Sequence, residues 1–214
     1  PAVTDAMSSG IPIIAIDTGV SGADVTSFVA TDNYAVAKVQ GAIAATLVND
    51  GDTVIYVTGN QAQSTGQERR NGFMEAFSAA RPGSKILEVP TEWNSQQAQE
   101  GVEAVLNSNS DVKMVVNAWD GGTMGAKAAL ENLGYSAGDV KLVGFDGASD
   151  AIAAMDEGWV HADTAQMLYQ MGYQGIKAAA AAARGETVSS RIDTGFFLVT
   201  PSTSGVYKKM VGIN

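Results

Sequence analysis

Acidic, amide and aromatic residues stand directly after several short apolar runs in the sequence. This set contains no obvious catalytic arrangement, but it suits a neutral polyol. Carboxylates and guanidinium groups bind adjacent hydroxyls in pairs, and each charged hydrogen bond contributes about 1.5–3 kcal/mol. Indole faces cover the apolar C–H side of a sugar ring. The residues that follow the runs are Asp17, Thr18, Asn60, Trp93, Trp119, Asp120, Asp146 and Gln166, and Arg69 lies in the second turn of a helix predicted from residue 64.

The apolar runs alternate with amphipathic segments along the whole chain. This alternation is typical of βαβ units and predicts an α/β fold with a parallel sheet. In open α/β sheets, ligands bind outside the carboxyl ends of the strands, where the polar residues above are placed. Strands are predicted at residues 11–16, 53–57, 85–89, 112–117, 140–145, 161–165 and 194–199, and helices at residues 34–48, 64–80, 95–108, 122–133, 149–157 and 168–184.

Each candidate residue also has a purely structural interpretation. An acid after a strand is more often a helix N-cap than a ligand contact, and we expect Asp120 and Asp150 to be caps. We expect Trp159 to pack in the core, and His161, the sole histidine, to have a surface or strand role. Arg69 could simply pair with Glu68 or a neighbouring acid. The convergence of several candidates on one edge of one sheet nevertheless favours a binding site.

The composition narrows the classes of function. The 214 residues include 23 acids and 13 bases, for a net charge of −10, which argues against nucleic acid or an anionic membrane surface as a partner. Cysteine is absent, which excludes disulfides and thiolate metal sites. No apolar run is long enough for a transmembrane helix. The G-x-S-x-G, HExxH and G-x-G-x-x-G motifs are missing, and DGGTMGAK lacks P-loop spacing, so we expect a protein that is not an enzyme.

Five segments resemble one family, and they occur along the chain in the same order as in that family. LVGFDGASDAI resembles the GFDG-x-x-D signature of type I periplasmic sugar-binding proteins, the ribose- and galactose-binding class of ABC-transporter receptors. IPIIAIDTG resembles that family's first-lobe strand ending in a ligand-binding Asp, and VATDNYAVAKVQG its crossing between lobes. GNQAQSTGQERRNGF resembles the segment with a ligand Arg, and AWDGGTMGA the Asn-Asp loop. The similarity covers nearly all of the sequence.

Carried over position by position, the resemblance implies a set of ligand residues. Two positions depart from the ribose-type pattern, which has Arg where this chain has Thr18 and Asn where it has Trp119. Both changes alter the hydrogen bonding and the volume of the pocket. The candidate ligands therefore include a different pentose, a hexose and a sugar alcohol. The matching ligand residues are Asp17, Arg69, Trp93, Asp146 and Gln166, and Thr18 and Trp119 join them as candidates.

The family's fold is the periplasmic binding protein type I, with two Rossmann-like parallel-sheet lobes joined by a hinge that closes on the ligand. Residues 1–32 and 166–193 would form a partial first lobe, residues 33–165 and 194–201 the second lobe, and residues 202–214 a C-terminal tail. Three strands and two helices of the family's first lobe have no counterpart in the sequence. We therefore expect an N-terminally incomplete receptor.

The resemblance also implies function and partners. Such a receptor binds a monosaccharide or sugar alcohol in an interlobe cleft with high affinity and delivers it to a membrane ABC permease. A chemoreceptor is a second candidate partner. The protein would be a periplasmic or extracellular, membrane-tethered monomer without a cofactor, metal or nucleic acid. The alternative is the effector domain of a lac-repressor-like transcription regulator, which shares the fold. The acidic balance and the GFDG segment favour the receptor.

Overall fold

Parallel pairing of short apolar strands builds two separate sheets in the computed structural model, which describes residues 1–213. The chain divides into two units. The first consists of residues 1–32 and 166–196, and the second of residues 33–165 and 197 onward. The chain therefore crosses from one unit to the other at three points.

The sheet of the second unit has the strand order β4-β3-β5-β6-β7-β9. The pairs β3–β4, β3–β5, β5–β6 and β6–β7 are parallel. Strand order reverses between β3 and β5, and at such a switch point an open α/β sheet leaves a crevice beyond its carboxyl edge. The strands are β3 (Thr53–Val57), β4 (Lys85–Val89), β5 (Val112–Asn117), β6 (Lys141–Asp146), β7 (Val160–Gln166) and β9 (Phe196–Val199).

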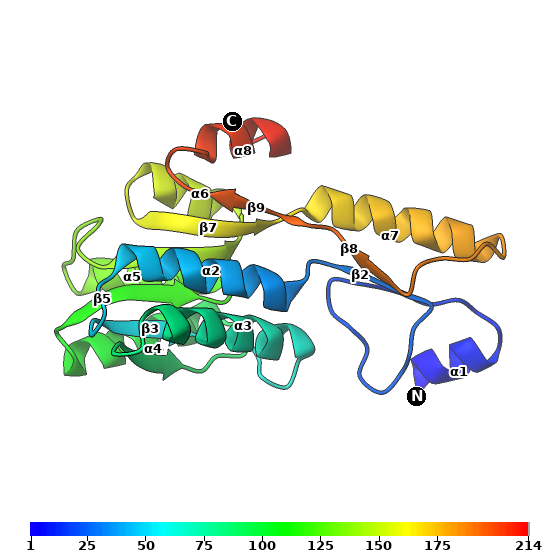
Figure 1. Cartoon of the computed structure of the whole chain (residues 1–214), viewed down its shortest axis with the longest axis horizontal. Coiled ribbons are helices and arrows are strands. Elements are labelled where there is room, and N and C mark those ends of the chain that lie inside the picture. The colour runs from blue at the N-terminus through cyan, green and yellow to red at the C-terminus, as the bar shows by residue number, and fades with distance from the viewer. Residues whose placement is uncertain (214) are drawn as a thin grey trace. The chain divides into compact units, whose positions relative to one another are not determined.

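Helices cover both faces of this sheet (Figure 1). On one face, α2 and α3 lie side by side. A Cβ added to Gly72 would come within 2.3 Å of the Tyr34 carbonyl oxygen, so glycine allows the close approach of these helices. Beneath them Tyr56 stacks on Phe73 at 4.4 Å between ring centroids, in the main core. The helices are α2 (Asn33–Leu47), α3 (Ser64–Ala80), α4 (Ser95–Ser108), α5 (Asp120–Asn132), α6 (Ser149–Asp156) and α8 (Ser204–Val211).

The first unit is smaller. Its sheet has the order β1-β2-β8, all parallel, and packs on α7 around Val29, Met171 and Ala178. The outer side of α7 leaves large apolar side chains exposed, among them Tyr169 at 79% and Ile176 at 72%. The elements are α1 (Ala2–Ser8), β1 (Ile14–Ile16), β2 (Ser27–Ala30), α7 (Leu168–Ala183) and β8 (Arg191–Asp193).

The strand predicted at residues 194–199 is wrong in its first part. Gly195 has a φ of 72° and interrupts the extended run, so β8 ends at Asp193 and β9 begins at Phe196. Among the elements that were not predicted are β2, β8 and the C-terminal helix α8. The helix predicted from residue 122 begins two residues earlier, at Asp120.

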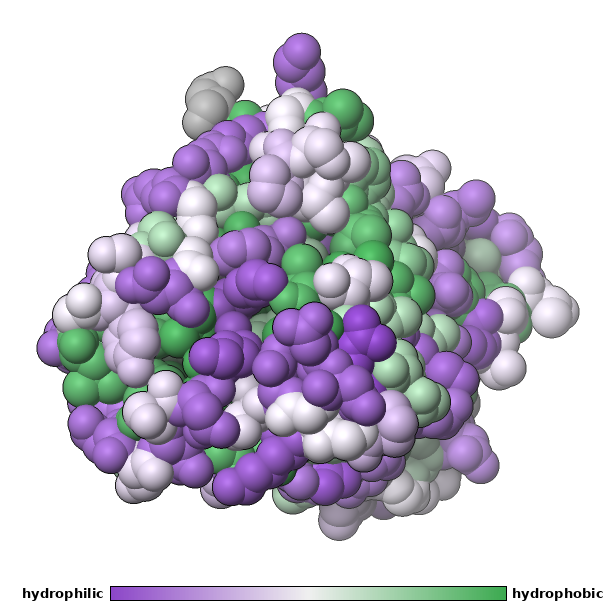
Figure 2. All heavy atoms as spheres, turned by 60° about the vertical axis from the view of Figure 1, so that its left-hand side comes forward, coloured by the Kyte–Doolittle hydropathy of each residue, from purple (hydrophilic) through white to green (hydrophobic). Residues whose placement is uncertain are grey.

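On the face shown in Figure 2, hydrophilic residues are interspersed with smaller hydrophobic areas. Across residues 1–213, each helix is too short or too polar to cross a membrane.

Candidate ligand-binding site

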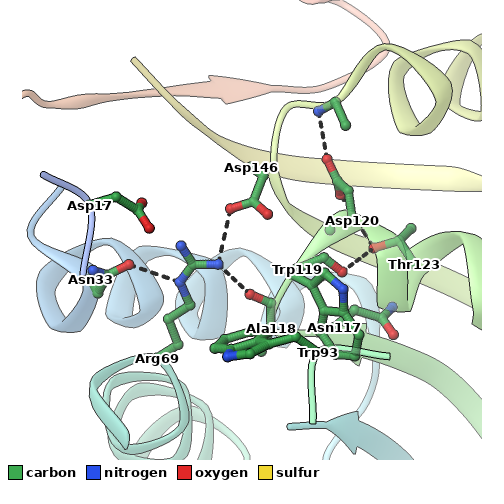
Figure 3. Close-up of polar contacts among 12 residues, drawn as sticks. Asp17, Asn33, Arg69, Trp93, Asn117, Ala118, Trp119, Asp120, Thr123 and Asp146 are labelled. Atoms are coloured by element: carbon green, nitrogen blue, oxygen red, sulfur yellow. Dashed lines mark hydrogen bonds and ion pairs between the residues drawn. The ribbon is translucent and has the colours of Figure 1, made fainter. Parts of the chain in front are cut away.

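Four of the seven candidate residues lie in the second unit, at the carboxyl edge of its sheet (Figure 3). Trp93 follows β4, Trp119 follows β5, Asp146 ends β6, and Arg69 stands in the second turn of α3, the helix after β3. The parallel strands bring these side chains to one edge, as the sequence predicts. The other three belong to the first unit. Asp17 and Thr18 follow β1, and Gln166 is the last residue of β7.

Arg69 is the organising residue of this edge. Its side chain is buried, with 3% of the residue exposed. Nε donates to Asn33 Oδ1 at 2.8 Å, and Nη1 donates to the Ala118 carbonyl at 2.7 Å and to Asp146 Oδ1 at 2.9 Å. The guanidinium also stacks over the Phe145 ring, with Cζ 3.9 Å from its centroid. These contacts fix the position of the cation, which pairs with Asp146.

Asp146 is held in an unusual backbone conformation. Its φ is 119°, a region that side chains other than glycine rarely adopt. Its side chain is 27% exposed while its partner Arg69 is 4% exposed. The carboxylate therefore has one oxygen bound to the buried guanidinium and a face open to solvent. That geometry suits hydrogen bonds with ligand hydroxyls.

Trp93 contributes an aromatic face beside the ion pair. Its backbone has a φ of 59°, and its Nε1 donates to Gln63 Oε1 at 2.7 Å. The ring lies directly over Gly59, where an added Cβ would be 2.0 Å from Trp93 Cη2. Arg69 Cζ is 5.7 Å from the ring centroid. Glycine at position 59 therefore makes the room in which the indole lies.

Trp119 stands at a right angle to Trp93. Their ring centroids are 5.4 Å apart with an interplanar angle of 89°, an edge-to-face arrangement that aromatic pairs favour. Trp119 is 9% exposed, and its ring crowds Gly121 and Gly122, where an added Cβ would lie 2.5 Å and 2.8 Å from ring atoms. Together the two indoles form an apolar corner next to the Arg69–Asp146 pair.

Backbone strain marks the candidate residues. Within residues 1–213, the non-glycine residues with positive φ are Asp17 at 69°, Trp93 at 59° and Asp146 at 119°. All three are candidates for ligand binding. Residues in such conformations persist only where the surrounding structure holds them, and they cluster at functional sites.

In the first unit, hydrogen bonds orient Asp17. Its amide donates to the Val29 carbonyl at 3.0 Å, and Thr18 Oγ1 donates to Asp17 Oδ2 at 3.1 Å. Gln166 is buried, with 6% of the residue exposed. Thr18, which replaces the Arg of the ribose-type pattern, is thus a partner of the neighbouring carboxylate.

Several contributors to the site were not identified from the sequence. Asn33 receives the Arg69 Nε hydrogen bond, although the sequence indicates only a helix start there. Behind the edge, Gln40 Nε2 donates to the carbonyls of Asn117 and Gly144, both at 2.9 Å. This amide ties the ends of β5 and β6 together. Phe145, next to Asp146 in the GFDG segment, could have been identified as the support for Arg69.

The prediction that Asp120 and Asp150 are helix caps is wrong. Trp119 occupies the N-cap position of α5 and Ala148 that of α6, without a capping hydrogen bond from either side chain. Asp120 Oδ2 instead accepts a hydrogen bond from the Ala148 amide at 2.7 Å. Asp150 Oδ1 accepts one from the adjacent Ala151 amide at 2.9 Å.

The structural interpretations predicted for two other residues hold. Trp159 is buried in the main core, as predicted. His161 lies in β7, half-buried, with Nδ1 3.1 Å from the Trp159 carbonyl. Burial lowers the pKa of His161 below its usual value. In the described part of the chain, no three acidic, histidine or cysteine side chains gather as they would around a metal ion.

The comparisons with known proteins agree with this architecture. A family model described as a periplasmic binding protein domain matches residues 1–187. The ribose import binding protein of Escherichia coli (strain K12) is 31% identical over 198 residues, which are 92% of this chain and 66% of that protein. The D-allose-binding periplasmic protein of the same organism is 32% identical over 183 residues, 82% of this chain and 58% of that protein.

A solved structure shows the same likeness. The solute-binding protein of an ABC transporter from Bacillus halodurans C-125, with bound myo-inositol, superposes with a TM-score of 0.89 at 27% identity. The match covers 97% of this chain and 72% of that one. The chain spans at most 66% of the length of the two curated relatives. With a family match over residues 1–187 and relatives above 30% identity, the chain belongs to the periplasmic binding protein domain family.

Proposed function

We propose that the protein is a receptor for a neutral monosaccharide or sugar alcohol, which it passes to an ABC permease. The observation that carries this proposal is the buried Arg69 joined to the partly exposed Asp146 at 2.9 Å, with Trp93 and Trp119 beside them. The site thus presents an oriented donor, an oriented acceptor and an apolar corner. Those are the complements of a ring that has hydroxyls on its rim and C–H groups on its faces.

The names of the relatives support this class of ligand. The two curated relatives are binding proteins for ribose and for D-allose. The solved structure contains myo-inositol, a cyclic polyol. These three compounds share several neighbouring hydroxyls and carry no charge. Because Arg69 is already compensated by Asp146, a neutral ligand leaves the charge of the site in balance.

Each candidate residue receives a role in the proposal. Asp146 accepts hydrogen bonds from two adjacent ligand hydroxyls, and Arg69 donates to one of them from Nη2. The face of Trp93 stacks on the ring, while Trp119 limits the pocket on one side and selects among ligands by shape. Asp17, Thr18 and Gln166 of the first unit stay candidate ligand residues.

A role in transport fits better than a role in transcription. The curated relatives are named as import and periplasmic binding proteins, which supports a receptor outside the cytoplasm that works with a permease. A lac-repressor-like regulator would share the fold, but the names of the matched relatives favour the receptor. The periplasm is accordingly the proposed location.

Calorimetric titration with ribose, D-allose and myo-inositol tests the proposal. We expect saturable binding of at least one of them, and a loss of about 1.5–3 kcal/mol in binding free energy when Asp146→Ala removes a charged acceptor. The matched control is Asp150→Ala, whose carboxylate bonds only locally and which should bind like the wild type. Equal affinity of all three proteins would exclude Asp146 as a ligand residue.

A further inference from the structure

Two carboxyl groups lie buried directly behind the candidate site. Asp120 in the first turn of α5 is 2% exposed and Asp163 in the middle of β7 is 0% exposed. Both reach the same point beside Gly144 of β6. A Cβ built on Gly144 would lie 2.4 Å from Asp163 Oδ2 and 2.5 Å from Asp120 Oδ1. The glycine therefore leaves the space in which the two side chains meet.

Asp163 Oδ2 and Asp120 Oδ1 both lie within 2.5 Å of the position of the Cβ added to Gly144, so the two oxygens are neighbours. Both Asp163 oxygens are buried and lack a hydrogen-bond partner among the described residues. Ionised carboxylates are acceptors only, so a hydrogen bond between these two buried acids requires a proton on one of them. Burial, followed by the charge of Asp163, raises the pKa of Asp120 well above its usual value. Burial also raises the pKa of Asp163, to about 7. Two buried acids in contact cannot both ionise readily.

Asp120 of this pair and two other side chains hold the turn of residues 146–148. Asp120 Oδ2 accepts the Ala148 amide at 2.7 Å. Tyr207 from α8 donates its hydroxyl to the Gly147 carbonyl at 2.9 Å, and Arg69 binds Asp146. Each of the residues 146–148 is thus fixed by a separate side chain. The turn needs this support because Asp146 and Gly147 both have positive φ, at 119° and 78°.

We propose that Asp120 and Asp163 share a single proton and that this acid pair acts as a positioning element for the turn of residues 146–148. While the proton is present, the hydrogen bond between the acids keeps Asp120 against the Ala148 amide. When the proton leaves at alkaline pH, two adjacent anions repel each other beneath the turn, and Asp146 loses its fixed orientation. The proposal deepens the proposed function and, for its effect on affinity, rests on it.

The charged and titratable groups that face the pair come from three other elements. Asp146 at the end of β6 adds negative charge and disfavours ionisation of both acids. Arg69 on α3 acts in the opposite direction on Asp163. Tyr207 on α8 is itself affected, because burial and the three acids raise its pKa. The phenol therefore stays protonated and keeps its hydrogen bond across the range in which the pair titrates.

A test that needs no ligand follows from the shared proton. Infrared spectroscopy at pH 7 should show the C=O band of a protonated carboxyl group, and this band should vanish in Asp163→Asn and in Asp120→Asn. Each asparagine can donate from Nδ2 to the remaining carboxylate, and in Asp120→Asn the Oδ1 can still accept from Ala148. The control, Asp150→Asn at an exposed position of α6, should leave the band unchanged. Absence of the band in the wild type would overturn the proposal.

The pH dependence of folding gives a second ligand-free readout. The pair keeps its proton where the unfolded chain has lost it, so the folding equilibrium constant should fall by up to about tenfold per pH unit as pH rises above about 4. The fall continues until the pair ionises. The folding equilibrium constants of Asp163→Asn and Asp120→Asn should depend less steeply on pH. Equal slopes in the wild type and both variants would show that the pair holds no extra proton.

The ligand titration separates this proposal from the proposed function. Wild-type affinity for the bound sugar or polyol should weaken by about tenfold between pH 6 and pH 9, the loss of roughly one positioning hydrogen bond. Affinity of Asp163→Asn should stay constant over the same range. Constant wild-type affinity would overturn the positioning role even where the infrared band is present. Failure of all neutral ligands to bind at pH 6 would refute the receptor and leave the ligand-free tests of the acid pair standing.

Discussion

Arg69 Nη1 donates to Asp146 Oδ1 over 2.9 Å, a contact between residues 77 positions apart that joins α3 to the end of β6. The cation is buried and the anion is partly exposed. The pair therefore compensates a buried charge and also orients a carboxylate toward solvent. Stability of the second unit and the proposed ligand recognition involve the same contact, and each can be measured separately.

Arg69→Ala should lower the free energy of unfolding by about 3–5 kcal/mol, because it removes one partner of a buried pair together with its packing. Urea unfolding of the purified protein measures this change. The matched control is Arg70→Ala. Arg70 pairs with Glu88 at 2.5 Å on the surface, and such pairs contribute about 0–1 kcal/mol. Similar losses in the two variants would contradict the central place of Arg69.

Gly59→Ala should displace the Trp93 ring. The added Cβ would come within 2.0 Å of the indole, and such overpacking costs about 1–3 kcal/mol. Tryptophan fluorescence should report the moved ring, and titration should show weaker ligand binding. In the control Gly205→Ala the new Cβ meets nothing within 4 Å, so fluorescence and affinity should match the wild type. Wild-type affinity in Gly59→Ala would show that the position of Trp93 is irrelevant to binding.

Trp119→Phe should change which ligand binds best. A smaller ring enlarges the apolar corner, so affinity for the larger ligands should rise relative to ribose. Differences of one small group in a pocket are worth about tenfold or more in discrimination. The affinity ratios for ribose, D-allose and myo-inositol provide the measurement. Trp159 precedes β7 and so lies at the amino edge of the parallel sheet, opposite the site. Trp159→Phe should therefore keep the wild-type ratios, and unchanged ratios in Trp119→Phe would remove Trp119 as a specificity residue.

His161 should make the protein less stable as pH falls. Its pKa in the folded chain is lowered by burial, so the unfolded chain takes up a proton first as pH drops below about 6.5, the ordinary value for histidine. The free energy of unfolding should therefore decrease through this range more steeply in the wild type than in His161→Gln. The acid pair acts in the opposite direction, which is why the difference between the two proteins is the useful quantity. A difference in the free energy of unfolding between the wild type and His161→Gln that does not vary with pH would refute this role of His161.

The fold of the second unit could largely be predicted because each strand is a short apolar run with an amphipathic helix after it. The strands Thr53–Val57 and Val112–Asn117 have the same bounds in the sequence prediction and in the structure. The short strands of the first unit could not be separated in this way. β8 has three residues, too few to form a recognisable apolar run. Gly195 separates β8 from β9 by its left-handed conformation, which the residue pattern does not reveal.

Proximity within the site was predictable only in part. The carboxyl ends of parallel strands must share an edge, which places Trp93, Trp119 and Asp146 together. The sequence does not show that Arg69 reaches Asp146, because Glu68 is an equally plausible partner on pattern alone. The sequence prediction also misassigned Asp120 as a helix cap. A carboxylate at the start of a helix resembles a cap unless the packing of β7 and of the turn after β6 is known.

A thermal-shift screen with neutral sugars, polyols, phosphorylated sugars and nitrogenous metabolites tests the receptor most directly. A ligand at a hundred times its dissociation constant stabilises the native state by about 2.7 kcal/mol, or roughly 5–10 °C in Tm for a chain of this size. We expect such a shift with a neutral sugar or polyol in the wild type, and its loss in Asp146→Ala. No shift with any neutral compound, together with a clear shift from a phosphorylated or nitrogenous one, would contradict the receptor for sugars.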